Sequence, residues 1–149
     1  MMNLIVRGIG AAPLVVMLAL CPGRPAVSRP LTSVDDWLGL WRGTYVCGQG
    51  VTGLSLTVKR SGEGEVAAVF SFFAVPENPE VPTGEFDMTG RPGPQGNHLR
   101  LFPHAWTNAP PRFVMVGLDG DYDEASGEYS GRVRGPACTG FVLRRDLIA

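Results

Sequence analysis

Apolar and polar residues alternate along short segments of the chain, and this alternation predicts β-strands. The clearest case is the segment 51–60, where Leu54, Leu56 and Val58 alternate with polar residues. The segment 65–73 repeats the pattern, with apolar residues at every second position. A period of two is typical of a strand with one buried face. No amphipathic helix longer than a few residues is found, so the chain is expected to be all-β.

Eight such strands are expected, separated by segments rich in glycine and proline. The first carries Trp41, Tyr45 and Cys47, and the others are expected at 51–60, 65–73, 84–90, 98–103, 112–119, 128–135 and 138–145. Most connections have the composition of hairpin turns. Short strands joined in this way predict a small eight-stranded antiparallel meander barrel.

The connections of a meander alternate between the two ends of the barrel. One end is expected to collect four of them, at 48–50, 74–83, 104–111 and 135–137. Two of these are long and rich in proline, and long loops on a rigid scaffold commonly carry binding residues. The candidate ligand-binding residues at this end are Gln49, Asn78, His104, Trp106 and Asn108.

Trp106 is the strongest of these candidates, because it is an aromatic residue in a loop rich in proline. Such a side chain can stack on a sugar ring or anchor a protein partner. The alternative interpretation is that Trp106 covers the end of the barrel as part of the core.

Residues 1–28 have the pattern of a secretory signal peptide. Arg7 precedes an apolar run at 9–21, and small residues suited to cleavage follow it up to Ser28. The run is shorter than the roughly 20 apolar residues of a membrane span. The mature chain is therefore expected to be periplasmic or secreted, without a membrane span. An alternative is a lipoprotein that is acylated at Cys21.

After the signal peptide, residues 29–36 are interpreted as a linker and residues 37–149 as the barrel domain. Removal of the signal peptide leaves Cys47 and Cys138 as a pair. Paired cysteines in an oxidising compartment commonly form a disulfide. We therefore expect a disulfide that closes the barrel between its first and last strands.

Charge and residue content exclude several classes of function. The chain has 13 basic and 14 acidic residues and no basic run, so nucleic acid is not an expected partner. Its two histidines, His98 and His104, are fewer than the three or four ligands that zinc takes. No serine lies in a G-x-S-x-G elbow. We therefore expect no metal, no cofactor and no enzymatic activity.

Gly39-Leu40-Trp41 resembles the G-x-W signature that opens lipocalins and avidin-like barrels. The resemblance implies a calycin-type barrel in which an arginine of the last strand packs over the tryptophan. Arg144 and Arg145 are the two residues of this chain that would fill this role.

Two further resemblances concern exported proteins. Tyr45-Val46-Cys47 is similar to an early Y-x-C of the periplasmic inhibitors of C-type lysozyme, and Tyr129-Ser130-Gly131 is loosely similar to their inhibitory loop. The stretch 41–145, with W-x-G-x-Y-x-C near its start, resembles more closely a bacterial exported barrel domain of unassigned function. That resemblance implies no activity.

The function expected from these patterns is that of an exported, non-enzymatic binding module. Loops at one end of the barrel would hold a small apolar or saccharide-like ligand, or a protein partner. The alternatives are a periplasmic inhibitor of a cell-wall hydrolase and a structural protein of the cell envelope.

Overall fold

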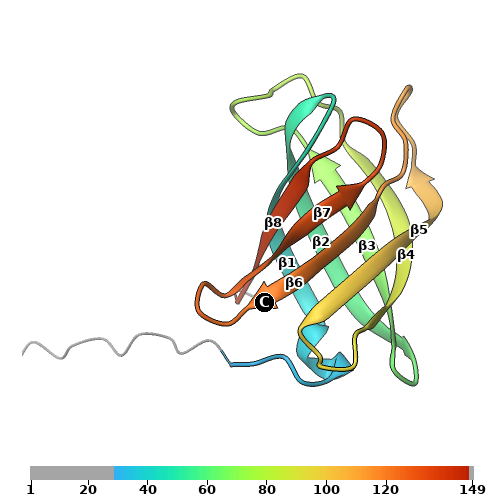
Figure 1. Ribbon diagram of the computed structural model, residues 1–149. Coiled ribbons are helices and arrows are strands. Elements are labelled where there is room, and N and C mark those ends of the chain that lie inside the picture. The colour runs from blue at the N-terminus through green and yellow to red at the C-terminus, as the bar shows by residue number, and fades with distance from the viewer. Residues whose placement is uncertain (1–28, 148–149) are drawn as a thin grey trace, which may run out of the picture.

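The computed structural model describes residues 29–147, and its eight antiparallel strands close into a barrel (Figure 1). Each strand pairs with the next along the chain, and β8 pairs with β1. The strands are β1 (Gly39–Cys47), β2 (Gly50–Gly62), β3 (Glu65–Phe73), β4 (Gly84–Pro92), β5 (His98–Asn108), β6 (Gly117–Asp123), β7 (Glu128–Arg134) and β8 (Gly140–Arg145). The predicted all-β meander barrel is confirmed. The expected signal peptide and Cys21 lie outside the described residues.

The interior of the barrel is filled by side chains. Alternate residues of each strand point inward, and many of them have no exposed surface. The largest fully buried side chains are those of the strand residues Trp41, Tyr129, Phe70, Phe72 and Phe86, together with Trp37 of the segment before β1. An eight-stranded barrel is just wide enough for its side chains to fill it. The inside of the barrel is therefore the hydrophobic core of the protein.

The boundaries of β5 and β6 differ from those predicted. β5 continues to Asn108, and β6 begins only at Gly117, so the long connection is 109–116 rather than 104–111. β5 pairs with β6 only as far as Leu101, which faces Leu118. Pro103 therefore needs no amide hydrogen on that side, and proline is tolerated on such an edge. Two register shifts in the pairing of β4 with β5 accommodate the extra residues.

The disulfide between Cys47 and Cys138 is present, which confirms the prediction. Cys47 is the last residue of β1, and Cys138 lies in the connection between β7 and β8, two residues before β8 begins. The bond therefore joins the first strand to the approach of the last strand. The expected start of the last strand at Cys138 was two residues too early.

The opposite end of the barrel, which we call the base, is closed by the 3₁₀-helix η1 (Val34–Trp37). Trp37 Nε1 donates to Gly96 O at 2.8 Å, and Trp41 Nε1 donates to Trp37 O at 3.0 Å. Residues 29–36, interpreted from the sequence as a linker, also contribute the buried Leu31 to the core. The segment before β1 is therefore packed against the barrel.

Arg145 lies over Trp41, with its guanidinium carbon 4.5 Å from the ring centroid. It donates to Leu38 O at 2.7 Å and to Asp36 O, which ties β8 to the segment before β1. Arg144 instead pairs with Glu128 at 2.7 Å. Of the two arginines expected to cover Trp41, Arg145 therefore does so, and the contact adds a cation–π interaction.

Asp36 is expected to stabilise the base in a pH-dependent way. The backbone N–H of Thr32 donates to its carboxylate at 2.9 Å and, with hydrogen bonds from Ser33 and the charge of Arg29, lowers the pKa of Asp36 to about 2. Because the pKa of Asp36 is lower in the folded protein than in the unfolded chain, the ionised carboxylate stabilises the fold at pH values above about 4. This stabilisation is lost as the pH falls from about 4 to about 2. We expect Asp36→Asn to cost about 1–2 kcal/mol at pH 7.

Urea unfolding of wild-type protein and of Asp36→Asn, at pH 7 and at pH 2.5, measures this effect. Asp35→Asn is the matched control, because Asp35 is an exposed partner of Arg60 and such pairs contribute about 0–1 kcal/mol. The deficit of Asp36→Asn should shrink at low pH. A deficit that does not change with pH would contradict the assignment.

Candidate functional site

A pocket of about 300 Å³ lies at the end of the barrel that carries the disulfide, and we call it the disulfide-end pocket. Three chain segments form it: the end of β1 with the turn that follows, the connection 109–116, and the connection before β8. These connections lie at the upper end of the barrel in Figure 1. The lining residues are Tyr45, Cys47, Gly48, Gln49, Arg112, Phe113, Val114, Val116, Pro136 and Cys138.

Tyr45 and Gln49, which form the polar floor of this pocket, bind each other and the buried Thr52, which is not among the lining residues. Gln49 Nε2 donates to the Tyr45 hydroxyl and to Thr52 Oγ1, both at 3.2 Å, and Thr52 Oγ1 donates to Gly50 O at 3.2 Å. Burial raises the pKa of the Tyr45 phenol, and its hydrogen bonds with Gln49 and Thr52 only partly oppose this effect. Tyr45 is therefore neutral at physiological pH and does not act as a base there.

The loops around the disulfide-end pocket carry backbone strain. Arg112 (φ 67°) and Ala137 (φ 55°) are the two non-glycine residues of the described chain with a positive φ. Arg112 lines the pocket, and Ala137 lies between the lining residues Pro136 and Cys138. A non-glycine residue with a positive φ lowers the stability of the fold by about 1–3 kcal/mol, and such residues cluster at active sites and ligand clamps. The strain therefore marks this end of the barrel as a candidate site.

The strain at Arg112 predicts an unusual order of stability. Because glycine adopts a positive φ without steric cost and valine does not, Arg112→Gly should be about 1 kcal/mol more stable than Arg112→Val. Arg132 in β7 is the matched control: it has ordinary strand backbone, where valine is favoured, so the order should reverse. Thermal unfolding of the four variants measures both differences. The same order at both positions would contradict the strain at Arg112.

Two of the five predicted site residues come together at this end. Gln49 lines the pocket, and the side chain of Asn78 donates from Nδ2 to Gln49 O at 2.6 Å and to Val51 O at 3.1 Å. Asn78 thereby attaches the connection 74–83 to the turn between β1 and β2. Its role in the structure is to brace the rim, while Gln49 reaches the pocket itself.

The other three predicted residues do not line the pocket. Trp106 lies in β5, not in a loop as expected, and packs edge-on against Phe72 (6.3 Å between centroids) and Phe86 (5.2 Å). Asn108 Nδ2 donates to Thr83 O at 3.2 Å. His104 lines a hollow on the outer wall. Trp106 therefore packs against the edge of the core and remains partly exposed, and its role in ligand binding stays a prediction.

The sequence did not single out Arg112, Phe113, Val114 or Val116, which form one wall of the pocket. Phe113, Val114 and Val116 make the expected strand 112–119 apolar on both faces, and a short apolar run of this kind is equally typical of a buried strand. The residue pattern alone does not distinguish a buried strand from a loop that packs on the core. Pro110 and Pro111, immediately before it, are the one signal of irregular backbone.

Tyr129-Ser130-Gly131, which is loosely similar to an inhibitory loop, lies inside β7. Tyr129 is fully buried, and its hydroxyl donates to Leu99 O at 2.8 Å. Ser130 and Gly131 pair with Val142 and Phe141 of β8. These residues therefore do not form a projecting loop.

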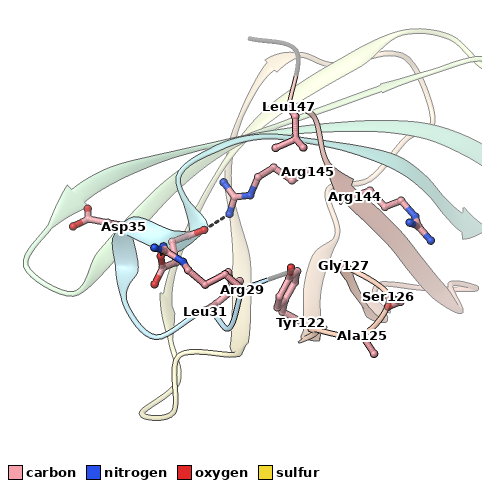
Figure 2. A pocket seen from close by; sticks show the side chains of 11 residues that line it. Arg29, Leu31, Asp35, Tyr122, Ala125, Ser126, Gly127, Arg144, Arg145 and Leu147 are labelled. Carbon is pink, nitrogen blue, oxygen red and sulfur yellow. Dashed lines mark hydrogen bonds and ion pairs between the residues drawn. The ribbon is translucent and has the colours of Figure 1, made fainter. Parts of the chain in front are cut away.

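A second pocket, of about 580 Å³, lies at the base between the segment before η1 and the end of β8 (Figure 2). Its charged side chains already have partners within the fold. Arg29 pairs with Asp36, Asp35 pairs with Arg60, and Arg144 pairs with Glu128. Figure 2 shows Arg145 reaching toward η1, where it bonds to backbone oxygens. These contacts give the charges of the base pocket a structural role.

Within residues 29–147, no cluster of three His, Cys, Asp or Glu side chains has the arrangement of a metal site. The described helix is also too short to cross a membrane. Comparison with protein-family models, curated proteins and solved structures finds no match to this chain.

Proposed function

We propose that this protein is an exported, non-enzymatic binding module that holds a small ligand in the disulfide-end pocket. The observation that carries the proposal is the coincidence of a pocket with the two strained non-glycine residues, Arg112 and Ala137. Strain of this kind persists where the surrounding structure holds it in place, and it is typical of ligand clamps.

Covalent and hydrogen bonds connect the segments at the rim of this pocket, which supports a binding role. The disulfide fixes Cys47 to Cys138, and Asn78 fixes the neighbouring connection to the backbone of Gln49 and Val51. A site that is already ordered loses little conformational entropy when a ligand binds. The filled interior, in turn, favours binding at the rim rather than inside the barrel.

The residues that line the pocket support binding rather than catalysis. They include no serine, histidine, aspartate or glutamate, and the two cysteines are joined in the disulfide. General acid–base and nucleophilic catalysis use side chains of these kinds or a tyrosine, and burial raises the pKa of the lining Tyr45 and keeps its phenol protonated. The disulfide and the signal-peptide pattern of residues 1–28 support export.

A substitution that fills the pocket should abolish binding without unfolding the protein. Val114 lines the pocket and is 56% exposed, so Val114→Trp adds bulk there without disturbing the core. A thermal-shift screen of small apolar compounds measures binding through the added stability of the folded protein. A compound present at 100 times its Kd should stabilise the wild type by about 2.7 kcal/mol. We expect this stabilisation to disappear in Val114→Trp.

Val142→Trp is the matched control, because Val142 is similarly exposed but lies on the outer wall of β8. Compounds should stabilise this variant as they stabilise the wild type. Compounds that bind Val114→Trp as well as the wild type would place the site elsewhere and contradict the proposal.

A further inference from the structure

We infer that the ligand of the disulfide-end pocket is a compact apolar molecule with one anionic group, which Arg112 binds at the rim. The inference rests on the proposed function and narrows the class of ligand. It selects among the three classes expected from the sequence, which were an apolar ligand, a saccharide and a protein. The charge, the walls and the floor of the pocket each contribute one step.

The first step is the charge of Arg112. Its side chain is exposed and makes no ion pair with any carboxylate of residues 29–147. No acidic residue lines the pocket, so the guanidinium is the only charge there among the described residues. An arginine fork binds a carboxylate through two parallel hydrogen bonds. Arg112 is among the residues that line the pocket, and its backbone has a positive φ of 67°.

The second step concerns the walls. Phe113, Val114, Val116 and Pro136 present apolar surface to the pocket, together with the disulfide. Val116 is buried, and Phe113 stacks on Phe72 with 5.2 Å between the ring centroids, so this wall is continuous with the core. The volume of about 300 Å³ lies at the lower end of the range for ligand pockets. The ligand body is therefore apolar and compact.

The third step disfavours a saccharide. A sugar buries several hydroxyl groups, and each needs a hydrogen-bond partner to replace water. The nitrogen of Gln49 already donates to Tyr45 and Thr52, and the Thr52 hydroxyl donates to Gly50 O. The side-chain amide of Gln49 therefore has no free donor. An apolar body with a single anionic group leaves fewer polar groups without partners.

Isothermal titration of the purified protein with a matched pair of probes tests the inference. 3-Phenylpropionate supplies an apolar ring and a carboxylate, and 3-phenylpropanol is its neutral counterpart. The carboxylate is expected to bind the wild type about tenfold more tightly than the alcohol. Arg112→Gln should remove this difference by weakening the carboxylate alone. Arg132→Gln removes a charge outside the pocket, where Arg132 makes no ion pair among the described residues, and should change neither affinity.

The outcomes separate this inference from the proposed function. Equal binding of both probes to the wild type, or tight binding of glucose, would overturn the inference and leave the pocket as the site. Carboxylate binding that survives Val114→Trp would place the site elsewhere and overturn both. Binding of neither probe at millimolar concentrations would also count against both. Arg112→Gly, which keeps the backbone conformation without strain, shows whether any lost affinity reflects the guanidinium rather than misfolding.

Discussion

Replacement of Trp37 by alanine is expected to lower the free energy of unfolding by about 3–5 kcal/mol. Trp37 has no exposed surface, and its ring centroid lies 4.8 Å from that of Tyr129 and 5.6 Å from that of Trp41. Its indole nitrogen also donates to Gly96 O, so truncation leaves a buried carbonyl without this partner. Both the cavity and the lost hydrogen bond destabilise the base.

Urea unfolding followed by circular dichroism measures this loss, with Trp37→Phe and Trp106→Ala as comparisons. Trp37→Phe keeps most of the packing and removes the hydrogen bond, so its cost should be smaller. Trp106 is only half-buried at the opposite end, and its truncation should also cost less. A loss below about 1 kcal/mol for Trp37→Ala would mean that η1 does not unfold together with the barrel.

The strands in which apolar and polar residues alternate strictly were predictable from the sequence, because one face of each is buried and the other is exposed to solvent. Leu54, Leu56 and Val58 in β2 are all buried, as the alternation predicted. Val66 and Phe70 in β3 follow the same rule. Hairpin turns rich in glycine then fixed the order of the strands, so the meander and its closure by Cys47 and Cys138 also followed.

The boundary between β5 and β6 was not predictable, because local patterns do not report which strands pair. The sequence predicts a strand at 98–103 followed by a proline-rich loop at 104–111. In the barrel, β5 extends past β6 at this point, and Pro103 lies where β6 offers no partner. Because β6 begins only at Gly117, residues 112–116 belong to the connection between β5 and β6 and not to a strand. Trp106 was therefore assigned to the wrong element.

The location of the candidate site was predicted more accurately than its residues. The meander places the connections after β1 and before β8 at one end, and Gln49 was identified from this reasoning. Arg112 was not identified, because its position depends on a positive φ that arginine rarely adopts. A conformation imposed by surrounding packing leaves no mark on the residue itself.

Removal of the disulfide by the double replacement Cys47→Ala and Cys138→Ala is expected to lower the free energy of unfolding by about 4–5 kcal/mol. The two cysteines are 91 residues apart, so the bond restricts a long loop of the unfolded chain. In the chain-entropy model the stabilisation grows with loop length. Urea unfolding of the oxidised protein, the reduced protein and the double variant measures the difference, and the last two should agree.

The double replacement also tests whether the pocket depends on the same bond. Cys47 and Cys138 line the disulfide-end pocket, and the pairing of β1 with β8 covers only five residues of each strand. We therefore expect loss of the bond to increase amide hydrogen exchange around Cys47 and to weaken binding of a carboxylate probe. Thiol titration is the control: the denatured, unreduced protein should show no reactive thiol from Cys47 or Cys138. Reactive thiols at these positions, or full stability without the bond, would contradict the role of the disulfide.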